Sequence, residues 1–142
     1  MNQYSATTVK AVFFMSGFAA LIYQIAWQRI LFTAFGVDLE SITIIIAVFM
    51  AGLGIGAYFG GRIADKFPKH IIFYFALTEI GIGIFGFASP TLIEFVKALF
   101  LHSSVTTVAL SNFILLLFPT FLMGSTLPLL TQYLNQYFDN IG

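Results

Sequence analysis

Four long apolar stretches, separated by short breaks that carry charged residues, dominate this sequence. Two of them, residues 42–61 and 105–130, contain no charged residue. A helix needs about 20 apolar residues to cross the ~30 Å hydrocarbon core of a bilayer, and each stretch reaches or nearly reaches that length. Because the runs are continuous and do not alternate with a period of two, a β-barrel is not expected. The pattern predicts four membrane-spanning helices, over about residues 9–34, 41–62, 70–89 and 105–131.

The scarcity of charge excludes a soluble globule. Only 8% of the residues are charged and 59% are hydrophobic, whereas soluble domains carry about 25% charged residues. The net charge of zero argues against a nucleic-acid partner, which requires a basic face. The chain has no cysteine, and its two histidines, His70 and His102, lie far apart, so no metal site is expected. We therefore expect an all-α integral membrane protein without a cofactor and without catalytic residues in this chain.

The distribution of Lys and Arg predicts the orientation of the helices. Four basic residues fall on one side of the predicted membrane, and two fall on the other side together with three acidic residues. The positive-inside rule makes the more basic side cytoplasmic, which places both termini inside and the protein in the inner (cytoplasmic) membrane of the cell. The cytoplasmic side carries Lys10, Arg62, Lys66 and Lys69, and the opposite side carries Arg29, Asp38, Glu40, Glu94 and Lys97.

The connection after the third predicted helix allows two interpretations. Residues 91–100 place Glu94 and Lys97 three apart among apolar residues, which suggests a short helix lying in the membrane interface. The same residues are equally consistent with a continuation of the third helix beyond Pro90.

Four polar residues inside the predicted spans form a candidate intramembrane site. Gln24 and Gln28 share one face of the first helix, and Arg29 follows them, roughly 10 Å from its outer end. Glu79 lies near the middle of the third predicted helix, at a depth similar to that of Gln24. A carboxylate at this depth is costly unless it is protonated or paired. Three interpretations stay open: an acid hydrogen-bonded to a glutamine, an ion pair with Arg29, or a proton or cation site. Arg29 could instead snorkel to the outer headgroups beside Trp27 as an interface anchor.

The fourth predicted helix contains two prolines, Pro119 and Pro128. Each removes a backbone hydrogen bond, which predicts a kink. The small residues Gly124, Ser125 and Thr126 between them favour close packing and hydrogen bonds from hydroxyls back to helix carbonyls. Such helices line cavities or serve plain packing, and both interpretations stay open.

The glycine-rich stretch AGLGIGAYFGG fits two patterns. Gly52, Gly54 and Ala57 match the G-x-G-x-x-[G/A] loop that binds a dinucleotide, but that unit needs a strand before the glycines, a tight turn and a helix after them. Charged residues end the segment instead, so a nucleotide site is not expected. Gly52, Gly56 and Gly60 recur every four residues, which predicts a helix face on which a neighbouring backbone comes close.

The residues after these glycines resemble the loop between helices 2 and 3 of major facilitator superfamily transporters. The family pattern is a glycine, three residues, an aspartate, a basic residue, one residue, a glycine and two basic residues, and this chain departs from it at Pro68. The resemblance implies that the aspartate and the basic residues brace the cytoplasmic face and help to gate alternating access. The matching residues are Gly61, Arg62, Asp65, Lys66, Lys69 and His70.

A second resemblance covers nearly the whole chain. Four blocks look like the membrane part of spermidine-synthase-like membrane proteins, in which a facilitator-like bundle precedes a soluble aminopropyltransferase-like domain. The glycine-rich nucleotide motif and the acidic residues of that domain are not in this sequence, so we expect the first part of a larger protein or a stand-alone four-helix relative. The blocks are SGFAALIYQIAWQRIL (16–31), FMAGLGIGAYFGGRIAD (49–65), LTEIGIGIFGFASP (77–90) and FPTFLMGSTLPLLTQYL (118–134).

Three functional hypotheses remain open. The first is a membrane module of a spermidine-synthase-like, polyamine-related protein, acting as an anchor or as a transporter-like bundle. The second is a small transporter or channel subunit with Glu79 as the ion or proton site, and the third is a structural subunit of a membrane complex. Because a facilitator pathway uses two six-helix halves, the expected partners are the lipid bilayer and further transmembrane helices.

Overall fold

The computed structural model describes residues 6–35, 39–99, 102 and 104–139 of the chain, and it is helical almost throughout these ranges. The four long helices all contain segments that are long and apolar enough to cross a membrane. Over these ranges the protein is therefore all-α, with four helices capable of spanning a bilayer, as its hydropathy predicted. The elements are α1 (Ala6–Phe35), α2 (Leu39–Lys66), the short 3₁₀ helix η1 (Pro68–His70), α3 (Ile71–Leu99) and α4 (Val105–Asp139).

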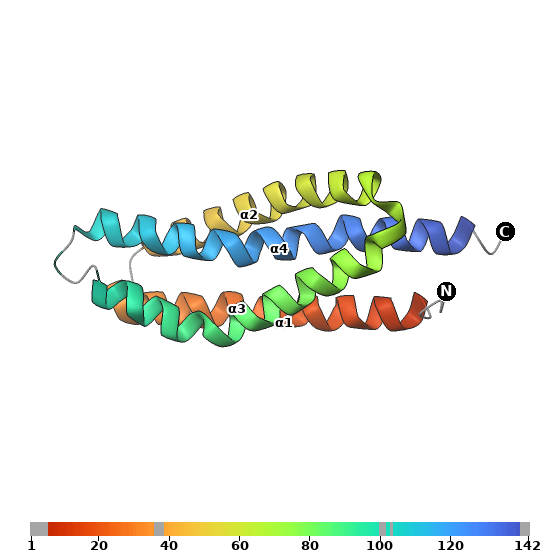
Figure 1. The fold of residues 1–142 in the computed structure, drawn as a ribbon. Helices are drawn as coiled ribbons and strands as arrows, with labels where there is room; N and C mark the ends of the chain where they lie inside the picture. Colours follow the sequence, from red (N-terminus) through yellow and green to blue (C-terminus); the bar gives the residue numbers. More distant parts are fainter. Residues whose placement is uncertain (1–5, 36–38, 100–101, 103, 140–142) are drawn as a thin grey trace.

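The four helices lie alongside one another, with α1 and α3 running in one direction and α2 and α4 in the other (Figure 1). As a result, α1 begins and α4 ends at the same end of the bundle as η1. We call this end of the bundle the turn end. The most extensive interface joins α2 to α4, and α3 packs on α4, whereas α1 makes fewer contacts with the other helices.

All four helices are longer than the hydropathy predicted, α1 by a few residues only. Helix α2 continues to Lys66 and α4 continues to Asp139, because the polar residues that follow each apolar stretch are good enough helix formers to extend the helix beyond the hydrocarbon core. Helix α3 passes through Pro90 and ends at Leu99. Of the two interpretations of residues 91–100, the structure therefore shows a continuation of the third helix as far as Leu99, and the separate interfacial helix is wrong.

The interior consists of two apolar clusters. One surrounds Trp27 and includes Val48, Ile82 and Leu116. The other lies near the turn end and includes Val9, Ala64, Phe75 and Leu129.

Large apolar side chains also cover the outside of all four helices. Phe87 on α3 is 91% exposed, Phe14 on α1 is 72% exposed and Met50 on α2 is 71% exposed. Water-soluble proteins rarely expose contiguous apolar surface on this scale. A bilayer is the solvent in which such an exterior is stable.

Candidate functional site

The glycines of α2 form a close backbone contact with α4. Gly52, Gly56 and Gly60 are all buried. A Cβ added to Gly60 would lie 2.7 Å from the Cα atom of Ser125, and one added to Gly56 would lie 3.1 Å from the Cα atom of Gly124. The absence of side chains on this face is therefore what lets the two backbones meet. We call this contact the glycine seam.

The remaining glycines of the stretch do not build a nucleotide loop. Gly54 faces open space, with no atom within 4 Å of an added Cβ. The whole stretch lies inside α2, so neither the strand nor the tight turn that a dinucleotide site needs is present in this segment.

The buried hydroxyls of α4 are satisfied by carbonyls of the same helix. Thr120, which an added Cβ at Gly52 would meet, donates to the carbonyl of Leu116 at 2.9 Å. Ser125 and Thr126 each donate to the carbonyl three residues earlier, at 2.7 Å. Because each hydroxyl donates its hydrogen bond within its own helix, it can be buried in the seam without a partner on α2, and it is not directed at a ligand.

Both prolines of the fourth helix lie within α4, which is a single continuous helix. Figure 1 shows no sharp bend along it, so the predicted kinks do not break the element. Pro119 is among the fully buried side chains, whereas Pro128 lines a groove between α2 and α4.

A hydrogen-bonded chain joins α1 to α3 beside Pro90. The indole N–H of Trp27 donates to the hydroxyl of Ser89 at 2.8 Å, and this hydroxyl donates to the carbonyl of Gly86 at 2.9 Å. Proline at position 90 has no N–H for the carbonyl four residues earlier, which is that of Gly86. Ser89 therefore replaces the missing donor, which explains why α3 continues through the proline.

Trp27 is an interior residue and not an interface anchor. It is 1% exposed and packs against three rings, those of Tyr23 at 5.8 Å, Phe49 at 5.8 Å and Phe85 at 6.0 Å between centroids. The expectation of an anchor in the lipid interface is wrong, because α1 turns this indole toward Ser89 and the core. The ring of Tyr23 also occupies the space that a Cβ of Gly86 would fill.

Glu79 contacts α1 at Ser16, which the sequence did not indicate as its partner. Its carboxyl forms a hydrogen bond with the hydroxyl of Ser16. Its Oε1 atom is buried and has no hydrogen-bond partner among the described residues. Glu79 also lies eight residues after Ile71, roughly 12 Å from the start of α3. Because α3 extends to Leu99, its middle is near residue 85, and Glu79 lies on the turn-end side of that point.

The other members of the predicted intramembrane site lie too far along α1 to reach Glu79. The contacts of Ser16 with Glu79 and of Trp27 with Ser89 show that α1 and α3 run parallel in a nearly constant register. At about 1.5 Å per residue, Gln24 lies roughly 12 Å beyond Ser16 along the axis, and Gln28 and Arg29 lie roughly 18–20 Å beyond it. The pairings of Glu79 with the glutamines or with Arg29 are therefore wrong. Arg29 is exposed, and the two glutamines are half-buried.

The predicted cytoplasmic loop motif is mostly helical. Gly61, Arg62, Asp65 and Lys66 form the last turns of α2, and Lys69 belongs to η1. The guanidinium of Arg62 lies over the ring of Tyr58, 4.5 Å from its centroid. The carboxylate-bearing residue Asp65 lines the groove of about 380 Å³ that also includes Pro128. All the charged residues of the motif are exposed.

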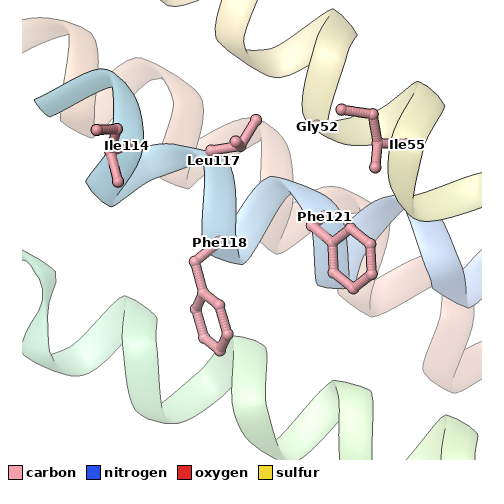
Figure 2. A pocket seen from close by; sticks show the side chains of 6 residues that line it. All are labelled: Gly52, Ile55, Ile114, Leu117, Phe118 and Phe121. Carbon is pink, nitrogen blue, oxygen red and sulfur yellow. The ribbon is translucent and has the colours of Figure 1, made fainter. Parts of the chain in front are cut away.

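A second groove lies beside the glycine seam at Gly52. It has a volume of about 250 Å³ and is lined by Gly52, Ile55, Ile114, Leu117, Phe118 and Phe121. Figure 2 shows Gly52 and Ile55 on α2 and the other labelled residues on α4, with the ring of Phe118 extending toward α3. The lining offers almost only carbon atoms, so the groove suits an acyl chain or an apolar side chain and has no group for acid–base chemistry. Within the described residues, no three His, Asp or Glu side chains gather where they could hold a metal ion.

No protein-family model, no curated protein and no solved structure matches this chain. The assignment of a function therefore depends on its own residues.

Proposed function

We propose that the chain is a multipass membrane module that works by associating with further transmembrane helices, as an anchor or as part of a transporter-like bundle. In this proposal the module contributes no catalytic residue. Both termini lie on the cytoplasmic side of the inner membrane, where the turn end carries Arg62, Lys66 and Lys69.

The observation that carries the proposal is the unequal packing of the four helices. The glycine seam joins α2 to α4 through their backbones, whereas α1 has only two buried residues in its described part, Val9 and Trp27. Helices in a bilayer gain stability from close packing of small residues and from interhelical hydrogen bonds. A helix such as α1, which uses few such contacts, has a large surface left for further helices.

The resemblance to spermidine-synthase-like membrane proteins supports the same proposal. Its four blocks contain the residues that make the helix contacts. Block 49–65 carries the glycines of the seam, and block 118–134 carries Thr120, Gly124 and Ser125, which face them. Blocks 16–31 and 77–90 carry the two α1–α3 hydrogen bonds. A facilitator-like arrangement would therefore use these residues to hold this part of a larger bundle together.

Cross-linking in native membranes tests whether further helices lie against the module. The chain has no cysteine, so a single cysteine gives an unambiguous cross-linking site. We expect Phe14→Cys on α1 to form adducts with another polypeptide, and Leu116→Cys in the buried core to form none. The module proposal would be refuted if single cysteines at exposed positions of all four helices reacted only with lipid-soluble reagents and formed no adduct with another polypeptide. The mass of each adduct distinguishes a second copy from another protein.

A small transporter or channel subunit is the second candidate, because one oxygen of the Glu79 carboxyl is buried without a partner among the described residues. Intramembrane acids often carry protons or cations. In proteoliposomes, Glu79→Gln should abolish proton or cation flux, whereas Glu94→Gln, at an exposed position of the same helix, should not. Flux that is unchanged in Glu79→Gln, in protein that assembles normally, would exclude this role.

A further inference from the structure

The turn end concentrates basic side chains over a short segment. Arg62, Lys66, Lys69 and His70 are all exposed, and Asp65 is the one acidic residue among them. These residues come from the last turns of α2 and from η1. Arg62 and Lys66 therefore lie in the last turns of a helix that is apolar enough to span the bilayer, and Lys69 and His70 follow that helix directly.

Two of these cations lie over aromatic rings. The guanidinium of Arg62 is 4.5 Å from the centroid of Tyr58, and the Nζ atom of Lys66 is 5.4 Å from the centroid of Phe67. A guanidinium that stacks on a ring uses its flat face. Its N–H donors lie along its edges, so stacking leaves them available to an anion.

Aromatic rings continue around the same turn. Phe67 and Phe73 each pack against Tyr74, with 5.8 Å between ring centroids. Tyr58 is 55% exposed and Phe73 is 63% exposed. Tyrosine is enriched at the membrane–water interface, where headgroups lie, and Tyr58 and Tyr74 both belong to this group of rings. In a bilayer spanned by α2, these rings would hold the stacked cations at the depth of the lipid phosphates.

We infer that the turn between α2 and α3 binds the phosphate headgroups of anionic phospholipids. Arg62 provides a planar, two-pronged donor that matches phosphate geometry, and Lys66 and Lys69 provide point charges beside it. A lipid phosphate is favoured over an acidic protein segment because the rings that hold the cations place them at the bilayer surface, where lipid phosphates are the most abundant anions. This inference depends only on the membrane-spanning character of the helices and not on the function proposed above.

Lipid adducts of the purified protein, counted by native mass spectrometry, test the inference. The chain would be presented with equal amounts of phosphatidylglycerol and phosphatidylcholine. We expect a preference for phosphatidylglycerol to which each cation contributes about fivefold. The variant R62Q/K66Q/K69Q should lose most of this preference, whereas K66R/K69R, which keeps Arg62 and every positive charge, should keep it. Raising the salt concentration should weaken the preference of the parent protein.

Matched single variants separate a local site from a general charge effect. Lys66→Gln removes a cation at the turn end, and Lys97→Gln removes an exposed cation near the other end of α3. We expect only Lys66→Gln to lower the preference, by about fivefold, with unchanged helical circular dichroism. Equal effects of the two variants, no preference in the parent protein, or full competition by inorganic phosphate would each overturn the inference.

Discussion

The glycine seam predicts opposite results for two nearly identical substitutions on α2. A Cβ added at Gly56 would overlap the carbonyl oxygen of Phe121 and lie 2.9 Å from the carbonyl carbon of that residue. Ordinary van der Waals contacts of a Cβ begin at about 3.4 Å, so the carbonyl carbon alone would require the two helices to separate by about 0.5 Å, and the closer carbonyl oxygen requires more. The obstructing atoms belong to the backbone, so no change of rotamer relieves the overlap. At Gly54, an added Cβ meets nothing within 4 Å.

The expected difference in stability follows from these two environments. Alanine is a better helix former than glycine by about 1 kcal/mol, and this gain is the same at both positions. Overpacking a close contact costs about 1–3 kcal/mol, and it applies only to Gly56→Ala. We therefore expect the free energy of unfolding of Gly56→Ala to be lower than that of Gly54→Ala by about 1–3 kcal/mol. Gly54→Ala itself should be neutral or slightly stabilising.

Unfolding of the purified protein by a denaturing detergent in mixed micelles measures this difference. Trp27 is the only tryptophan of the chain and lies in the core, so its fluorescence reports the loss of packing, and circular dichroism reports the helices. Equal stability of the two variants would show that the backbones of α2 and α4 do not touch at Gly56. A large loss in Gly54→Ala would show that the effect does not arise from overpacking.

Two further predictions concern the contact between α1 and α3. Ser89→Ala leaves the Gly86 carbonyl without its donor and should lower the free energy of unfolding by about 1–3 kcal/mol. This loss should be smaller in a Pro90→Ala background, because the backbone N–H of residue 90 is then present. Equal losses in both backgrounds would contradict the role of Ser89. In Gly86→Ala the added methyl group meets the ring of Tyr23, which should lower the free energy of unfolding by about 1–3 kcal/mol. Gly83→Ala, whose added methyl group faces open space, should not lower it. If both variants unfolded alike in the same detergent titration, the contact between Gly86 and Tyr23 would be disproved.

The positions of the spans and of the glycine face could be predicted from the sequence because both depend on local information. A run of apolar residues identifies a membrane helix wherever its neighbours lie. The spacing of Gly52, Gly56 and Gly60 places them on one face of any regular helix. The sequence did not identify α4 as the helix opposite them, since spacing on one helix contains no information about its partner.

The contacts between α1 and α3 could not be predicted in the same way. The partner of Glu79 depends on the register of two helices that are separated by α2 in the chain. Comparing the depths of residues along the two predicted helices did not reveal this register. Ser16, Tyr23 and Gly86 were missed for this reason. One local signal was available for α3. A serine directly before Pro90 is a hydroxyl next to a missing N–H, and it indicates that a helix can continue.

The glycine seam also constrains the order in which the chain can be assembled. Its two halves lie on α2 and α4, and all of α3 separates them in the chain. Because synthesis proceeds from the N-terminus, the glycine face of α2 is already made while its partner has yet to leave the ribosome. During that interval, lipid or another helix with small residues must cover Gly52, Gly56 and Gly60. The seam therefore cannot form until α4 has been made, and its closure displaces whatever occupied that face of α2.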